Sequence, residues 1–183
     1  MSGVFDSAEE LEGELLPALR TFLSSPAGEQ AQAAVKEFAP GSVVALQISD
    51  PELDVWVDFA SLEAGEGPRE DANGRLLLDG DALHHLGMDQ LAPAQVARAV
   101  EEKRIDAKGS FELMLILLES LDPLGAVWRE TLAAHGREDL LELPAPEATP
   151  IYTIEETPTR QGHVPEWSAK ARRAVSKSTR RND

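Results

Sequence analysis

The sequence predicts an α+β fold, in which a mostly antiparallel β-sheet is covered by helices. Two observations lead to this class. Apolar residues recur at helical intervals in residues 11–23 and fill residues 111–121, whereas residues 43–59 have the β-branched, alternating composition of a hairpin. The segments run in the order helices, hairpin and further strands, two short helices, a strand and a last helix, which is typical of an α+β domain.

The amino-terminal segment is predicted to be helical. Ser7 and Glu10 have the spacing of a capping box. Six apolar residues follow at helical intervals: Leu11, Leu15, Leu16, Leu19, Phe22 and Leu23. Pro17 interrupts this run, so we expect it to kink or divide the helix. A second short helix fits residues 29–38, which a Pro-Gly pair follows.

Residues 43–59 are predicted to form an antiparallel hairpin. The first half is apolar and largely β-branched, and residues 49–52 have turn chemistry. The second half alternates, so Val55, Val57 and Phe59 share one face of the strand, while two aspartates and a tryptophan occupy the other.

Two further strands are predicted after the hairpin. The first covers residues 75–78 and follows an acidic loop that contains glycine and proline. The second covers residues 104–108, where Ile105 and Ala107 are expected to face inward because side chains alternate along a strand.

Two short helices are predicted between these strands. Asp79 or Asp81 can cap the first, over residues 82–87, and Pro93 suits the first turn of the second, over residues 94–103. The second helix has an apolar face made of Val96, Ala97 and Val100.

Residues 111–121 form the most apolar segment of the chain. Their two acids are seven residues apart and share one narrow stripe. Such a helix must be covered nearly all round or must border an apolar cavity. The proline at position 123 is expected to end it, and residues 124–135 are predicted to continue as a final helix.

Composition divides the chain into three parts. Residues 1–40 are expected to be helices packed on the domain, residues 41–143 the main domain, and residues 144–183 a proline-rich tail with a basic end, because five of the 12 prolines lie beyond residue 143. Residues 160–183 carry a net charge of +5 and residues 1–159 a net charge of −21. The acidic body makes nucleic-acid binding unfavourable.

Several classes of protein are excluded or disfavoured by composition. The chain has no cysteine, which removes disulfides, thiol catalysis and thiolate metal sites. No apolar stretch reaches the ~18 residues of a membrane helix, and the amino end lacks the basic residues of a signal peptide. We therefore expect a cytoplasmic protein without integral membrane association.

The stretch from residue 43 to about residue 132 resembles the sterol carrier protein family of small lipid-binding domains. The resemblance rests on the hairpin, on RLLLDGDAL at residues 75–83, on GMDQLAP at residues 87–93 and on KRIDAKGS at residues 103–110. It departs from the family at Gly87-Met88, where members often have Gly-Lys, and in its long tail. The resemblance implies a five-stranded, mostly antiparallel sheet with helices around an apolar tunnel that holds a sterol, a fatty acid or an acyl-CoA-like molecule.

On this interpretation nine apolar residues are candidates for the tunnel wall. They are Val57, Phe59, Val96, Val100, Leu113, Met114, Leu117, Leu118 and Trp128. For each of them taken alone an ordinary core position is the favoured interpretation, whereas the cluster as a whole favours a cavity.

Catalytic and metal-binding patterns are scarce. His84 and His85 point in directions about 100° apart on a helix and cannot share a metal, so we interpret them as surface or capping residues. Pairs of carboxylates, such as Asp54 with Asp58, are expected to be solvated. No nucleotide-binding loop, nucleophile motif or zinc spacing is present, and no cofactor is predicted.

Three functions follow from the sequence. The preferred one is non-catalytic binding or transfer of a hydrophobic small molecule. The second is an enzyme that converts an apolar metabolite in the same cavity with a buried carboxylate or histidine. The third is a dimerisation or docking module in which the basic tail binds a partner. A homodimer is one such arrangement.

Overall fold

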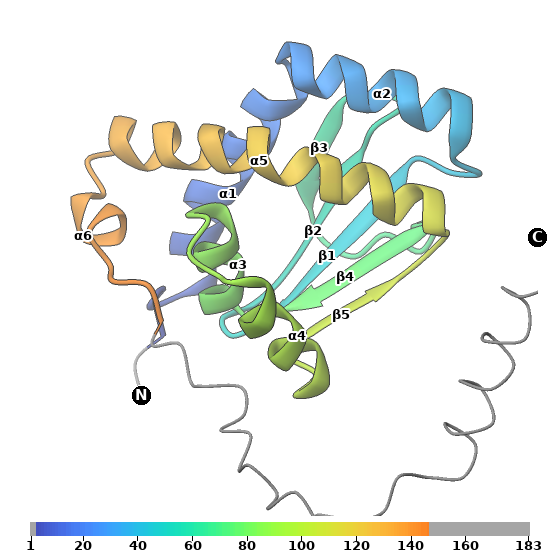
Figure 1. Ribbon diagram of the computed structural model, residues 1–183. Coiled ribbons are helices and arrows are strands. Elements are labelled where there is room, and N and C mark those ends of the chain that lie inside the picture. Colours follow the sequence, from blue (N-terminus) through green and yellow to red (C-terminus); the bar gives the residue numbers. More distant parts are fainter. Residues whose placement is uncertain (1–2, 147–183) are drawn as a thin grey trace, which may run out of the picture. The chain divides into compact units, whose positions relative to one another are not determined.

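The computed structural model describes residues 3–146 of the 183-residue chain. A five-stranded sheet with the strand order β3-β2-β1-β4-β5 forms its centre (Figure 1). The strands are β1 (Val43–Ser49), β2 (Glu52–Asp58), β3 (Glu63–Glu66), β4 (Gly74–Leu78) and β5 (Ile105–Lys108). Three neighbouring pairs are antiparallel, and only β1 and β4 are parallel within this sheet. The sheet is thus mixed but mostly antiparallel, as predicted.

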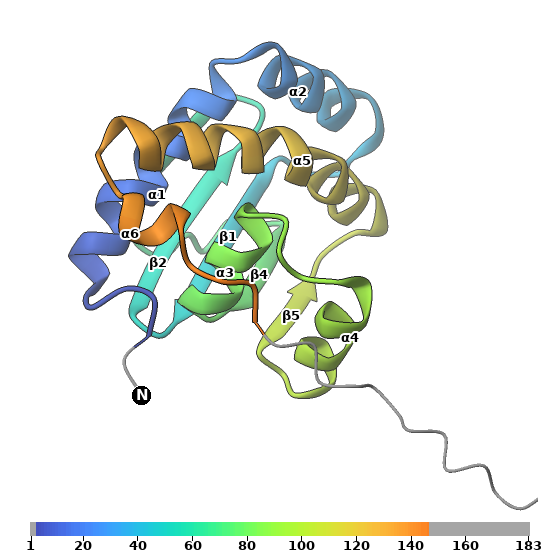
Figure 2. The same ribbon diagram turned by 60° about the vertical axis from the view of Figure 1, so that its left-hand side comes forward.

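Six helices accompany the sheet in the described part of the chain. They are α1 (Ala8–Leu23), α2 (Pro26–Phe38), α3 (Gly80–Gly87), α4 (Pro93–Glu101), α5 (Phe111–Ala134) and α6 (Glu138–Leu141). Helices α1, α2 and α5 pack against one another over the same side of the sheet (Figures 1 and 2). The predicted α+β class is therefore confirmed.

The hairpin has the predicted arrangement of its two faces. Val55, Val57 and Phe59 are buried and face the helices, whereas Asp54 and Trp56 are partly exposed on the opposite face. Val57 pairs with a buried valine of β1, so the inner face is apolar across both strands. The alternation of apolar and polar residues along the strand is therefore enough to predict the part of the core that the hairpin contributes.

Helix α1 begins where the capping box predicts. The side chain of Ser7 accepts a hydrogen bond from the backbone N–H of Glu10 at 3.1 Å. Pro17 lies inside the helix and does not divide it. The leucines on either side of the proline are buried against the same core, so their packing offsets the hydrogen bond that proline cannot donate.

Helix α5 differs from the prediction in its length. The sequence predicted an end at Pro123, but the helix continues as one element from Phe111 to Ala134 with the proline inside it. Proline in a helix interior costs about 3 kcal/mol. Buried side chains precede and follow it, among them Ile116 and Trp128, and their burial in the core outweighs this cost.

Helix α5 also differs in its coverage. One side of the helix borders the interior, but Phe111, Leu115 and Leu118 are 77%, 44% and 63% exposed. The first half of the helix is therefore not covered nearly all round, which leaves the other arrangement that the sequence allowed, a helix that borders an apolar cavity. Helix α2 packs against α5, and Leu113 and Met114 pack over Gly74 of the sheet, so the exposed residues lie on the remaining side.

Two smaller expectations are also corrected. Val100 was predicted on the inner face of α4, but it is half exposed, and Ala99 is the buried residue of that helix. Ala107 was predicted to face inward and is exposed on β5, which is an edge strand of the sheet. The proposed tail, residues 144–183, lies outside the described residues from residue 147 onward.

Candidate ligand-binding site

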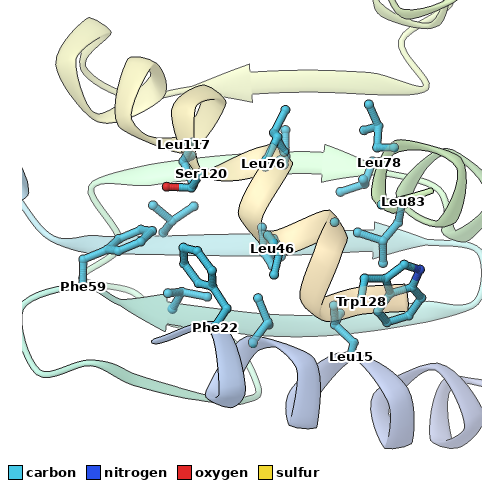
Figure 3. Close-up of a pocket in the computed structure, with 18 residues that line it drawn as sticks. Leu15, Phe22, Leu46, Phe59, Leu76, Leu78, Leu83, Leu117, Ser120 and Trp128 are labelled. Atoms are coloured by element: carbon cyan, nitrogen blue, oxygen red, sulfur yellow. The ribbon is translucent and has the colours of Figure 1, made fainter. Parts of the chain in front are cut away.

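An apolar cavity of about 100 Å³ lies between the sheet and helices α1, α3 and α5 (Figure 3). Eighteen residues line it: Leu15, Leu19, Phe22, Val44, Leu46, Val57, Phe59, Leu76, Leu78, Leu83, Leu86, Gly87, Leu117, Ser120, Leu121, Leu124, Gly125 and Trp128. Among the lining side chains, Phe22 and Phe59 lie toward one end, Leu46 lies between and Trp128 lies toward the other end (Figure 3).

The periodicity of each element brings its residues to this cavity. From α1 come Leu15, Leu19 and Phe22, which are spaced four and three residues apart and share one helix face. From β1 and β4 come alternate residues on the inner face of the sheet. Leu117 and Trp128 on α5 stand eleven residues apart, which is about three helical turns and returns to the same side of the helix.

The cavity wall contains almost no polar group. Among its lining side chains only Ser120 and Trp128 carry a polar atom, and none is ionisable. The Ser120 hydroxyl donates to the backbone carbonyl of Ile116 at 2.8 Å, within its own helix. The Trp128 indole N–H is buried and has no hydrogen-bond partner in the described part of the chain. The site can therefore hold an apolar molecule but offers no acid or base.

Helices α3 and α5 cross closely at Gly87 and Gly125, which both line the cavity. A Cβ atom at Gly125 would lie 2.8 Å from the carbonyl oxygen of Gly87, and a Cβ at Gly87 would lie 2.6 Å from the Trp128 ring. The Arg129 guanidinium donates to the same Gly87 carbonyl at 3.1 Å. Only glycine at both positions allows the two helices to come this close.

His84 lies next to this region and is fully buried, so its interpretation as a surface or capping residue is wrong. Its ring makes edge contacts with Phe5 and Trp128, at centroid distances of 6.1 and 6.2 Å. Burial, with a smaller contribution from the neighbouring His85, lowers the pKa of His84 to about 4. The residue is therefore neutral at pH 7, and it does not line the cavity.

The candidate carboxylates stand apart from the cavity. Asp54 lies on the opposite face of the sheet and accepts a hydrogen bond from Gln47 at 3.3 Å. Asp58 accepts hydrogen bonds from the Ala60 backbone and the Ser61 hydroxyl. Residues 3–146 contain no group of three acidic or histidine side chains placed to hold a metal.

The nine sequence-predicted site residues divide into three groups. Val57, Phe59, Leu117 and Trp128 line the cavity. Leu113 and Met114 pack instead over Gly74, at the start of β4, outside the cavity lining. The remaining three lie away from the cavity, on α4 and on the outer side of α5: Val96, Val100 and Leu118.

Sequence reasoning missed the contribution of α1 and the one hydroxyl of the wall. The apolar stripe through Leu15, Leu19 and Phe22 was visible, but nothing in the sequence showed which helix packs against α5 over the same side of the sheet. Ser120 was hidden within an apolar run, where its hydroxyl bonds to its own helix. Along the described residues, no helix combines the length and the apolar character needed to span a bilayer.

The fold and the cavity together define an α+β domain with an apolar interior site. No protein-family model and no curated protein sequence matches the chain. Among solved structures it is similar to the UbiJ-SCP2 ubiquinone synthesis protein, with 16% identity, 60% of this chain and 91% of that chain covered, and a TM-score of 0.44.

Two further solved structures are sterol carrier proteins by name. Sterol carrier protein 2 of Yarrowia lipolytica, in its apo form, has 18% identity, 72% and 98% coverage of this chain and of that chain, and a TM-score of 0.41. Sterol carrier protein 2 of Aedes aegypti, in complex with palmitate, has 16% identity, 56% and 97% coverage and a TM-score of 0.36.

Proposed function

We propose that the protein binds a hydrophobic small molecule in the cavity between the sheet and α1, α3 and α5, without a catalytic step of its own. The observation that carries this proposal is the cavity wall, whose 18 residues include no ionisable side chain. Transfer of apolar surface from water is worth roughly 25 cal/mol per Å², so such a wall supplies affinity without any reactive group.

The family resemblance supports the same function. Sterols, fatty acids and acyl-CoA-like molecules are the ligand classes that it implies, and the similar Aedes aegypti protein was solved with palmitate. An enzyme in the same cavity would need an acid or a base in contact with the ligand. The candidate acids and bases do not line the cavity, so the binding function is favoured over the enzymatic one; these candidates were His84, His85, Asp54 and Asp58.

Trp128 provides the test, because it lines the cavity and its fluorescence reports on a bound molecule. Trp56→Phe combined with Trp167→Phe leaves Trp128 as the sole tryptophan. We expect brominated apolar ligands, either bromobenzene or dibromostearate, to quench this variant saturably. An unbrominated analogue should reverse the quenching.

The matched control keeps the tryptophan on the other face of the sheet. Trp128→Phe with Trp167→Phe leaves Trp56, which is partly exposed and lies under the Arg69 guanidinium at 4.4 Å. This variant should show only the weak, linear quenching of collisions. Equal quenching of both variants, or no saturable quenching of Trp128 by either ligand, would refute binding in the cavity.

A further inference from the structure

The partly exposed residues of the cavity wall come from neighbouring elements on one side of the cavity. We propose that ligands enter and leave between α3 and α5, past a gate of leucine side chains, and that α3 is the element that moves to admit them. This inference rests on the proposed binding function and adds the route by which a ligand reaches the site. The exposure of the wall, the packing on its other sides and the weak anchorage of α3 support it.

Exposure divides the wall into a closed part and an open part. The lining residues that α1, β1 and β2 contribute are all buried, and so is Phe59. The partly exposed lining residues come from β4, α3 and α5 alone. They are Gly87 and six leucines, namely Leu76, Leu83, Leu86, Leu117, Leu121 and Leu124. The cavity therefore approaches the surface on the side where these three elements meet.

The gate at this side is made of side chains rather than backbone. The leucines of α5 recur at intervals of four and three residues and those of α3 are three residues apart, so each set shares one side of its helix. The two backbones approach each other closely at Gly87 and Gly125. Away from that contact, leucine side chains such as Leu83 and Leu121 border the cavity. Partly exposed side chains change rotamer within about nanoseconds, so this gate opens without the loss of a backbone hydrogen bond.

The other sides of the cavity are packed more firmly. Helix α1 buries eight residues along its length, and the strands under the cavity are joined by continuous ladders of backbone hydrogen bonds. At the Trp128 end, the rings of Phe5 and His84 pack against the indole with centroid distances of 6.3 and 6.2 Å. A ligand that crossed any of these sides would separate close-packed core residues, which costs more free energy than the rotation of partly exposed leucines.

Helix α3 is the less firmly held of the two helices at the gate. It has eight residues, and its buried residues are Gly80, Ala82 and His84, so only one large side chain anchors it. Helix α5 has 24 residues and buries several large side chains, among them Leu113, Ile116 and Trp128. A shift of α3 therefore exposes less apolar surface than an equal shift of α5, and the free-energy cost of opening is lower.

The one large anchor of α3 also favours the shift. Both ring nitrogens of His84 are buried and lack a hydrogen-bond partner within residues 3–146, and the same holds for the indole N–H of Trp128 beside it. A buried polar atom without a partner carries its full desolvation penalty. Movement of α3 away from α5 admits water to these atoms, so part of the cost of opening the gate is offset.

Stopped-flow quenching of Trp128 tests the route. The full-length variant with Trp128 as its sole tryptophan is mixed with dibromostearate, or with bromobenzene if only that ligand quenches. The dependence of the observed rate on ligand concentration gives the association and dissociation rate constants separately.

Leu121→Ala and Leu15→Ala form a matched pair for this measurement. Each removes the same atoms from a helix that lines the cavity, one at the gate and one on a closed side. We expect Leu121→Ala to raise the association rate constant at least threefold. Leu15→Ala should weaken binding through faster dissociation and leave the association rate constant within about twofold of the wild-type value. An unchanged association rate constant in Leu121→Ala, or equal increases in both variants, would overturn the route.

A second pair tests the movement of α3 and stands by itself if Leu15→Ala does not fold. His84→Leu removes the unpaired nitrogens at a position that does not line the cavity, so it favours the closed gate and should lower both rate constants at least threefold. His85→Leu makes the same change one residue further, where the side chain is partly exposed and hydrogen-bonded to Gln90 at 2.8 Å. It should lower neither rate constant. Exchange in His84→Leu as fast as in the wild type would overturn the role of α3.

The outcomes separate this inference from the proposed function. Saturable quenching of Trp128 with rate constants that do not respond to Leu121→Ala or to His84→Leu leaves ligand binding in place and overturns the inference. Absence of saturable quenching by either ligand overturns the proposed function and the inference together.

Discussion

Leu113 and Leu118 lie five residues apart on α5, and the structure gives them opposite environments. Leu113 is fully buried and packs over Gly74, whereas Leu118 is 63% exposed. Both were predicted to line the same tunnel, because the run around them is apolar on nearly every side. The two acids of the run mark only one narrow stripe, so the sequence did not show how far the exposed side extends around the helix.

The difference predicts unequal costs for the same substitution. Leu113→Ala should lower the free energy of unfolding by about 2–5 kcal/mol, because it deletes buried methyl groups and leaves a void. Leu118→Ala should change it by less than about 0.5 kcal/mol. Helix propensity changes equally in both, so urea denaturation of the two variants isolates burial. Similar losses in both would contradict the placement of this face.

His84 differs from its prediction in the opposite direction from Leu118, because it is a polar residue that lies inside the core. By its sequence context it occupies an ordinary position on a short helix, but the structure buries its ring against Phe5 and Trp128. No local sequence pattern predicts the burial of His84, because it depends on contacts with the amino-terminal loop and with α5, which are far away in the sequence.

The buried histidine predicts a pH dependence of stability. Its pKa falls from the ordinary 6.5 to about 4 in the folded state, mainly through burial. Between pH 6.5 and about 4 the unfolded chain therefore binds a proton that the folded chain does not, so stability decreases as the pH falls through this window. His84→Leu should flatten the dependence of the urea midpoint between pH 6.5 and 4.5. A slope identical to that of the wild type would contradict the assignment.

At the scale of the element, the α3–α5 crossing depends on two glycines. Gly125 has a backbone oxygen 2.8 Å from the position of an added Cβ, whereas Gly13 on α1 has no atom within 4 Å of that position. Both glycines stand inside helices. The pair therefore separates the effect of close packing from that of helix propensity.

Alanine at the two positions should have effects of opposite sign. Gly13→Ala should raise the free energy of unfolding by about 0.5–1 kcal/mol through helix propensity alone. Gly125→Ala gains the same propensity but forces α3 and α5 apart, and should lower it by about 1–3 kcal/mol net. Thermal unfolding of both variants measures these changes in stability. Stabilisation by Gly125→Ala would mean that α3 and α5 do not pack closely at this position.

Helices and strands with a clear periodicity of apolar residues were predictable, but the residues at which they begin and end were less predictable. The alternation of β2 placed Val55, Val57 and Phe59 correctly, and the Ser7 cap gave the start of α1. The predicted end of the helix at Pro123 was wrong. Proline usually ends a helix, but in α5 buried side chains on both sides of the proline stabilise one continuous helix. The cavity itself was half predictable: β2 and α5 supplied candidates, but the opposing wall from α1 required the three-dimensional arrangement.

At the scale of the whole molecule, an apolar interior is enclosed by a strongly acidic surface. The described residues carry a net charge of −18, counting Lys and Arg against Asp and Glu. Several basic side chains are already engaged in ion pairs, such as Arg104 with Asp79 at 2.7 Å. Surface ion pairs of this kind contribute little, so repulsion among the excess acids opposes folding.

This excess predicts that salt stabilises the protein. The Debye length falls from about 10 Å at 0.1 M to about 3 Å at 1 M, which screens long-range repulsion more than contact pairs. The midpoint of thermal unfolding should rise as NaCl increases from 0.02 to 0.5 M, and KCl should act equally, because neither salt strongly strengthens apolar burial as sulfate does. Replacing the exposed acids Glu112 and Glu119 by glutamine should reduce the dependence. A midpoint that falls with NaCl would show that the ion pairs, rather than the repulsion, dominate the surface electrostatics.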